Sequence, residues 1–321
     1  MENINDNRPA GEYRLERLDV NRLKDLAVLY KAVYGNKRSK EYFRAKYDTA
    51  YTGIEFIGYI AYSRDDKPAA FYGMIPCFIQ YKNEIILCAQ ATDAMTHPGH
   101  RYKGLFVKLA AMTFDLCKAS GVKFIFGFPN QNSFHGLFDK LHWQIKEVMD
   151  CFTIPVSTIP VESRLQRFKW TKWVYKYYTK WILHKYFLSQ QGLSNAGIQP
   201  GYAGVLRDNR YLEYKTYGAS QLIRIRQSEI WIKINNGLHI GDINMTGNKD
   251  DFDRVISTIV KIAKRLGVAK IIFQTSPGTH LHDLFSERYK PVPSFPVIFL
   301  NPGTELPLDK LKFTLADIDI F

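Results

Sequence analysis

The sequence contains few cysteines and no arrangement of them that indicates a metal site or a disulfide framework. Its 321 residues include four cysteines, which stand far apart inside apolar stretches: Cys77, Cys88, Cys117 and Cys151. They form no C-x-x-C pair, so they are best interpreted as buried thiols. The sequence also lacks H-E-x-x-H and G-x-x-x-x-G-K-[ST], which excludes the common zinc-protease and P-loop nucleotide sites. We therefore expect no metal.

Long apolar runs are missing as well. No stretch of about 18 apolar residues occurs, so we expect no membrane-spanning helix. The first residues, MENINDNRPAGEY, have neither a basic start nor an apolar core and do not resemble a signal peptide. These two absences predict a cytoplasmic protein.

Acidic side chains are under-represented relative to basic ones. The chain has 44 lysines and arginines against 31 aspartates and glutamates, a net charge of +13. Such an excess suits an anionic partner, which could be a nucleic acid, a membrane surface or a phosphorylated ligand. The total charge does not choose among these three, so its placement along the chain decides.

The first half of the sequence alternates between strand and helix patterns. Three consecutive strands are predicted at 55–62, 69–80 and 84–96, separated by short turns. A basic loop then leads into a helix at 104–120, which Gly121 ends, and a buried strand follows at 122–128.

A basic aromatic segment follows the first half. Residues 163–188 read as one helix with Ser163 and Gln166 as its capping box. One stripe carries Trp170, Trp173 and Trp181, and the other side carries lysines. In the first interpretation the tryptophans are buried between two domains. The alternative is a peripheral contact of 163–188 with an anionic membrane. Nucleic acid is the least favoured partner, because no recognised nucleic-acid motif accompanies the segment.

The last third of the sequence repeats the pattern of the first. A three-strand meander is predicted over 222–243, then a helix at 250–266, a strand at 269–274 and a helix at 280–287. The segments GVKFIFGFPNQNSFHGLF and GVAKIIFQTSPGTHLHDLF share the order glycine stop, apolar strand, polar loop and helix. We interpret this as an internal repeat. It predicts domains at 1–155 and 202–321, joined by a helical connector at 156–201.

The stretch TDAMTHPGHRYKGLFVKL carries the clearest chemical signal. A strand ends at Thr96, and a short basic loop leads into a helix whose first backbone N–H groups are unpaired. The N-terminus of a helix is a favourable site for a pyrophosphate. Gly104 has no Cβ and lets the backbone approach the phosphates, while Arg101 and Lys103 add positive charge.

These residues resemble the acetyl-CoA loop of the GNAT superfamily, in which Arg/Gln-x-x-Gly precedes a helix. Arg101 and Gly104 match, and Phe106 stands where a small residue is usual. The resemblance covers about residues 12–155 and, more faintly, 202–302. It implies an α+β fold with two tandem GNAT-like domains, each a mixed, mostly antiparallel sheet with flanking helices, the second degenerate. The implied cofactor residues are Ala94, Met95, Thr96, Arg101, Tyr102, Lys103, Gly104, Leu105, Phe106, Asn132 and Ser133.

The resemblance also implies a catalytic reaction and shows one departure from the family pattern. An amine would attack the thioester of acetyl-CoA, with a base taking its proton and an acid protonating the thiolate. The usual acid is a tyrosine, but the matching position holds Phe138. Asp93 is the candidate base, although a structural carboxylate explains it equally well. The second half starts its helix with Asp250 and Asp251, which would repel a pyrophosphate, so we expect no CoA there.

Three functions follow from this resemblance. The first is an N-acetyltransferase that uses acetyl-CoA and a small-molecule amine, with an amino sugar or a cell-envelope precursor as candidate acceptor. The second is a non-catalytic CoA-binding module, which the missing tyrosine favours. The third is a tRNA-dependent aminoacyl transferase, because such enzymes have similar paired domains and a helical arm.

Overall fold

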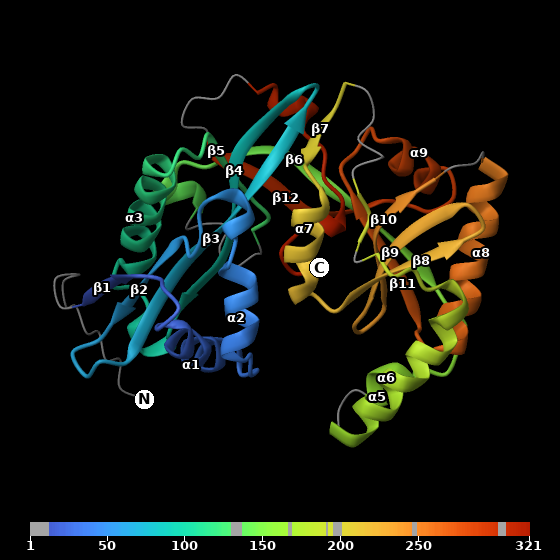
Figure 1. The fold of residues 1–321 in the computed structure, drawn as a ribbon, viewed down its shortest axis with the longest axis horizontal. Helices are drawn as coiled ribbons and strands as arrows, with labels where there is room; N and C mark the ends of the chain where they lie inside the picture. Colours follow the sequence, from blue (N-terminus) through green and yellow to red (C-terminus); the bar gives the residue numbers. More distant parts are fainter. Residues whose placement is uncertain are drawn as a thin grey trace. The chain divides into compact units, whose positions relative to one another are not determined.

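The computed structural model describes residues 13–129, 137–165, 169–190, 192–194, 201–245, 249–300 and 306–321 (Figure 1). The chain forms two compact units. The first contains residues 1–79, 84–146 and 297–306, and the second contains 80–83, 147–296 and 307–321. The predicted divisions were 1–155, 156–201 and 202–321, whereas residues 297–300, the last part of a strand near the C-terminus, belong to the first unit.

The first unit is a sheet with helices on both faces. Its strands are ordered β1-β2-β3-β4-β5-β12, and their bounds are β1 (Arg14–Arg17), β2 (Gly58–Tyr62), β3 (Pro68–Tyr81), β4 (Glu84–Thr96), β5 (Phe124–Gly127) and β12 (Val292–Leu300). Its helices are α1 (Leu23–Tyr34), α2 (Lys40–Tyr47) and α3 (Leu105–Ala119). Neighbours β1–β2, β2–β3 and β5–β12 are antiparallel, whereas β4 and β5 are parallel.

Two apolar clusters hold this sheet between its helices. One cluster packs α3 against the sheet through Leu105, Leu109 and Ala110, and the other packs α1 and α2 against the opposite face. The closing strand β12 contributes Ile298 to the α3 cluster, where it pairs with Gly127.

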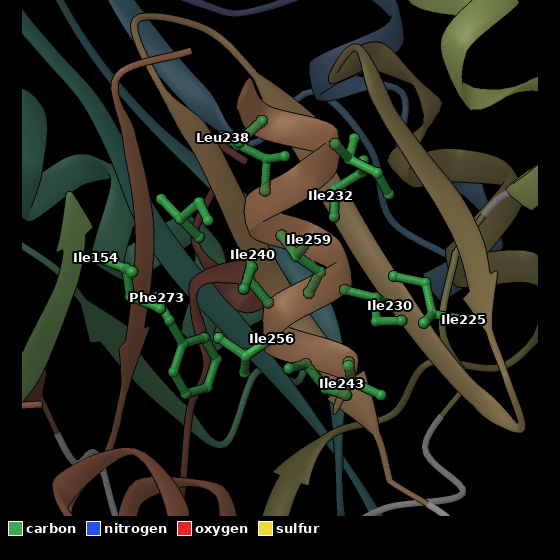
Figure 2. Close-up of a cluster of buried hydrophobic side chains, with 14 of the residues drawn as sticks. Ile154, Ile225, Ile230, Ile232, Leu238, Ile240, Ile243, Ile256, Ile259 and Phe273 are labelled. Atoms are coloured by element: carbon green, nitrogen blue, oxygen red, sulfur yellow. The ribbon is translucent and has the colours of Figure 1, made fainter. Parts of the chain in front are cut away.

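The second unit has the strand order β6-β11-β10-β9-β8. The bounds are β6 (Gln144–Pro155), β8 (Ser220–Ile225), β9 (Ser228–Ile234), β10 (Leu238–Asn244) and β11 (Lys270–Thr275), with a short β7 (Ala203–Val205). The helices are α5 (Val161–Leu165), α6 (Lys169–Leu183), α7 (Asn209–Tyr214), α8 (Lys249–Arg265) and α9 (His280–Ser286). Figure 2 shows the isoleucine-rich core between α8 and the sheet, with Ile240, Ile256 and Ile259 among its members.

The two units repeat one sequence of elements. In each, an antiparallel meander is followed by a long helix and by a strand parallel to the last meander strand: β4, α3 and β5 in the first, β10, α8 and β11 in the second. An antiparallel strand then completes each set, β12 beside β5 and β6 beside β11.

Both predicted glycine stops are confirmed. Gly121 and Gly267 have positive φ of 81° and 62°, a conformation that favours glycine at a helix C-terminus. The following residues close the same turn, since the Val122 N–H donates to Cys117 O at 3.0 Å and the Val268 N–H to Ala263 O at 2.9 Å. Each helix therefore ends in the same way before its parallel strand.

The basic aromatic segment differs from its prediction in three respects. The helix α6 ends at Leu183, and a 3-10 helix follows at His184–Tyr186, so the helix does not continue to residue 188. Ser163 lies inside α5, and its hydroxyl donates to Pro160 O at 3.3 Å, so its assignment as an N-cap was wrong. The prediction that Trp170, Trp173 and Trp181 are buried was also wrong, because these side chains are 72%, 62% and 73% exposed.

Among the described residues, none of the helices combines the length and the hydropathy that a membrane span requires. Within the same ranges, no group of three or more histidine, cysteine, aspartate or glutamate side chains could hold a metal ion.

Candidate functional site

The predicted site lies where β4 extends beyond its parallel neighbour. The last pair between the two strands joins Ala91 and Gly127, but β4 continues to Thr96. Ala94, Met95 and Thr96 therefore lie on a segment of β4 that β5 does not reach. Backbone N–H and C=O groups at such an edge can pair with an extended ligand as they would with another strand.

The side-chain alternation of β4 changes in the same segment. Ala89 and Ala91 pack in the cluster that contains α3, whereas Met95 is buried in the cluster that contains α1. In a regular strand these odd-numbered residues would share one face. The change of face is what an extra residue in the strand, a β-bulge, produces, and such bulges re-aim side chains next to functional sites.

A tight loop carries the chain from β4 to α3. The His97 N–H donates to Ala69 O at 2.8 Å, and a short 3-10 helix follows at Pro98–His100. The His97 ring accepts a hydrogen bond from the Gly99 N–H at 3.2 Å, and the ring Nδ1 of His100 lies 2.9 Å from the Tyr13 hydroxyl. Both histidine rings thus take part in local contacts that fix the course of this loop.

The end of the loop has a backbone conformation that favours glycine. Gly104 precedes the first residue of α3 with φ 74°, and a Cβ placed there would meet nothing within 4 Å. The space at the Cβ position of Gly104 is therefore open, and the backbone itself favours glycine. Tyr102 shares the positive φ, at 64°, and its side chain is fully exposed.

The first turn of α3 offers an anion-binding arrangement. It contains no acidic residue. Leu105 is buried, and Phe106 packs edge-on against Tyr72 with ring centroids 5.6 Å apart. Both side chains therefore anchor the start of the helix to the sheet. The bulky Phe106 thus occupies core space, and its backbone N–H remains one of the first donors of the helix.

Positive charge flanks this helix start. Arg101 is exposed and Lys103 is half-buried. Among the residues that the structure describes, Arg101 forms no ion pair, so its guanidinium can take a phosphate. Asn132 and Ser133, the remaining predicted cofactor residues, lie outside the described residues.

The candidate base Asp93 is held by two side chains of α2. Its Oδ2 accepts hydrogen bonds from Lys46 Nζ and from the Tyr47 hydroxyl, both at 2.8 Å. The side chains of Lys46 and Asp93 are 3% and 13% exposed. A buried ammonium needs a partner of opposite charge, so Asp93 has a structural duty whatever else it does. Phe138, in place of the usual tyrosine, packs beside the α3 cluster.

The second unit contains a counterpart of this site. The parallel pairing of β10 and β11 ends at Ile240 and Phe273, while β10 continues to Asn244. The register between β10 and β9 shifts between Ile240 and Asp242, the mark of a bulge. Asp242 thus stands two residues beyond the last parallel pair, as Asp93 does in the first unit.

Asp242 also holds a buried cation. Its Oδ2 accepts from Arg207 at 2.6 Å, and Asp317 Oδ1 accepts from the same guanidinium at 2.7 Å. Burial disfavours the charge of Arg207, but Asp317 and Asp242 outweigh it and raise its pKa. Burial raises the pKa of Asp242, although Arg207 opposes this.

A pocket lies beside this network, within the second unit. It has a volume of about 240 Å³, and its lining includes Tyr202, Arg207, Asp242, Asn244, Thr279 and Lys312. The helix after β10 differs from α3, because α8 carries Asp250 and Asp251 in its first turn. That charge disfavours an anion at its N-terminus.

The sequence analysis missed the buried cations Lys46 and Arg207. Each is far in sequence from its aspartate, so no local spacing reveals the pair. A signal for the equivalent aspartates was present, because Asp93-Ala94-Met95-Thr96 and Asp242-Ile243-Asn244-Met245-Thr246 share Asp and Met-Thr.

Part of this chain is similar in sequence to a known family, and its fold is similar to known structures. The family model of a GNAT acetyltransferase domain matches residues 15–143. No curated protein matches the sequence. Similar solved structures include a GCN5-related N-acetyltransferase from Kribbella flavida (9% identity, TM-score 0.56, 89% of this chain and 70% of that one). A second from Anabaena variabilis has 13% identity and TM-score 0.55 over 89% and 72% of the two chains. A Pyrococcus horikoshii protein has 14% identity and TM-score 0.53 over 99% and 98%. At these identities the likeness concerns the fold.

Proposed function

The chain carries a GNAT acetyltransferase domain in residues 15–143, and from this premise we propose that it is an N-acetyltransferase that uses acetyl-CoA. The acceptor is a small-molecule amine. Our candidate acceptors are an amino sugar and a cell-envelope precursor.

One observation supports this proposal above the others. The part of β4 that extends beyond β5 leads directly into the loop that contains Arg101. Gly104 is the residue immediately before α3. An extended pantetheine can pair with backbone at 94–96, and a pyrophosphate can accept hydrogen bonds from the first N–H groups of α3. One continuous stretch of chain can therefore bind both the pantetheine and the pyrophosphate of acetyl-CoA.

The chemistry requires a base and an acid. The amine nitrogen forms a bond to the acetyl carbon, the carbon–sulfur bond breaks, and the amine proton must leave. Asp93 is our candidate for the base. Its Oδ2 already binds Lys46 and Tyr47, so anchoring Lys46 is the competing role. Phe138 cannot donate a proton, and water can protonate the thiolate in its place.

We extend the proposal to the second unit, as a degenerate GNAT-like domain that binds no CoA. The repeated element order, the bulge near Asp242 and the buried Arg207 support a common origin of the two units. Asp250 and Asp251 at the start of α8 oppose pyrophosphate binding.

Thermal shift with acetyl-CoA and mass spectrometry of a panel of amines test this function together. A ligand that binds only the folded state raises its melting temperature. Arg101→Ala should weaken acetyl-CoA binding by about 1–3 kcal/mol, the scale of a hydrogen bond to a charged group. The matched control is Lys118→Ala, an exposed basic residue at the opposite end of α3.

The outcomes separate the alternatives. Equal affinity in Arg101→Ala and wild type would remove the loop from the site. A protein that binds acetyl-CoA and acetylates none of the amines would support the non-catalytic module. Binding of tRNA without any binding of acetyl-CoA would support the aminoacyl transferase.

A further inference from the structure

An unusual aromatic stripe covers the outer side of α6. Its members are Trp170, Trp173, Val174, Tyr177 and Trp181, which are between 49% and 73% exposed. At 3.6 residues per turn they fall within an arc of roughly 100°. Trp143 and Trp231, the other tryptophans of the chain, are 3% and 0% exposed. The exposure is therefore a property of this helix and not of tryptophans in the protein generally.

A different stripe of α6 attaches the helix to its own unit. Thr171, Tyr175, Thr179 and Ile182 are buried, spaced three or four residues apart. The Tyr175 hydroxyl donates to Leu266 O at 2.9 Å, which joins α6 to the end of α8 (Figure 1). The helix is thus fixed from one side, and the tryptophans are not needed to hold it in place.

Positive charge occupies one flank of the aromatic stripe. Lys172, Lys176 and Lys180 are exposed and recur once per helical turn. No acidic residue occurs between 169 and 188. Glu162, just before, is buried and accepts a hydrogen bond from the Asn236 N–H. The lysines therefore face solvent without a neutralising partner in this segment of the sequence.

We propose that α6 binds the surface of an anionic lipid bilayer, lying in the plane of the interface. Tryptophan and tyrosine favour the boundary between headgroups and acyl chains, and lysines beside them reach the lipid phosphates. No helix among the described residues could cross the bilayer, so the contact is peripheral. Lysines on one flank favour this occupant over an apolar protein partner. The proposal does not depend on the acetyltransferase function.

The tryptophans supply their own readout. Because Trp143 and Trp231 are buried, a change in the tryptophan emission of the full chain reports mainly on α6. We expect vesicles of phosphatidylcholine with phosphatidylglycerol to shift the emission to the blue and brominated lipids to quench it. Vesicles of phosphatidylcholine alone should bind much less protein in co-sedimentation.

Two sets of variants test the two components of the surface. Lys172→Glu/Lys176→Glu/Lys180→Glu should lower partitioning onto anionic vesicles by about a hundredfold or more, since each basic residue near the surface contributes. Trp170→Ser/Trp173→Ser/Trp181→Ser should lower it by about tenfold or more through lost apolar contact. The variants alter exposed side chains, so the fold should survive, and circular dichroism checks this.

A matched control separates local from total charge. Lys24→Glu/Lys31→Glu/Lys40→Glu changes the net charge equally at exposed sites of the first unit, and it should retain most of the vesicle binding. Equal loss in both lysine variants would overturn the proposal, as would an unchanged affinity after the tryptophan substitutions. If single-stranded oligonucleotides shift the tryptophan emission and vesicles do not, the partner of α6 is a nucleic acid and not a lipid bilayer. If the wild type is a dimer and the tryptophan variant is a monomer, the partner is a second copy of this chain.

Discussion

Asp93 and Asp242 occupy equivalent positions in their units, and each binds a buried cation. Asp93 holds Lys46 and Asp242 holds Arg207, at 2.8 and 2.6 Å. Removing one partner of a buried ion pair leaves the other charge uncompensated. The repetition of this arrangement in two separate units favours anchoring as the shared function of the two aspartates.

The two roles of Asp93 can be separated by a double variant. We expect Asp93→Asn to lower the free energy of unfolding by about 3 kcal/mol, because the buried Lys46 ammonium loses its counter-charge. Lys46→Met/Asp93→Asn removes the cation as well and should recover most of that loss, as measured by urea denaturation. If Asp93 only anchors Lys46, acetyl transfer recovers together with stability. Activity that stays about 10²–10⁴-fold low in the stable double variant would instead identify Asp93 as the base.

Lys215 makes the stability of the second unit depend on pH. It is 3% exposed, it donates to Ile318 O at 2.8 Å, and burial lowers its pKa to about 7. Between pH 7 and its ordinary pKa of about 10.4 the unfolded chain binds one more proton than the folded one, so stability rises with pH. Below pH 7 both states are protonated and the slope from this group vanishes.

Lys215→Met removes this dependence. We expect the wild type to gain about 2 kcal/mol relative to the variant between pH 7 and pH 9. The variant should be the more stable protein at pH 7 if Met fills the same space, and its advantage should shrink at pH 9. Denaturation at pH 7, 8 and 9 measures the difference. Parallel stability profiles for the two proteins would show that Lys215 titrates as an ordinary lysine.

At the scale of elements, the helix stops Gly121 and Gly267 form a natural pair for comparison. Their positive φ values are similar, but their surroundings differ. A Cβ on Gly121 would meet nothing within 4 Å, whereas one on Gly267 would lie 2.1 Å from a Val161 methyl group of α5. The first substitution therefore carries only backbone strain, and the second adds a steric conflict between α8 and α5.

Gly121→Ala should cost about 1–2 kcal/mol, the left-handed backbone penalty of an L-residue. Gly267→Ala should cost about 1–3 kcal/mol more, the range for forced overpacking. Denaturation melts of both variants and the wild type measure the difference. Equal costs would indicate that α5 moves away from Gly267 without penalty.

The sequence predicts the elements better than it predicts which of their faces is buried. Periodicity and glycine stops identify β4, α3 and α8 within a few residues of their observed bounds. The tryptophan stripe of α6 was also evident, but two apolar stripes compete on that helix. The stripe with Tyr175 and Ile182 packs against the second unit, so Trp173 on the other stripe stays exposed. Only tertiary packing decides between such stripes, so the local pattern could not.

At the scale of the molecule, the sequence predicts a similar order of elements in its two halves, but it does not predict the limits of the two compact units. The strand that pairs with β5 is β12, which follows the second unit's helices in the chain. Pairing partners this distant leave no local signature, because strand register is set by the sheet as a whole. The candidate site was predictable for the opposite reason: β4, the loop and α3 are contiguous, so one stretch of sequence contains its backbone geometry.

We propose that the start of α3 binds the pyrophosphate of acetyl-CoA, and calorimetric titration tests this binding most directly. Gly104→Asp puts a negative charge into the open space before α3, whereas Gly121→Asp makes the same change at an equally open glycine with positive φ at the other end of the helix. We predict that the wild type and Gly121→Asp bind acetyl-CoA with similar affinity and that Gly104→Asp shows no binding. A wild type without binding, or a Gly104→Asp variant that binds as the wild type does, would contradict the account.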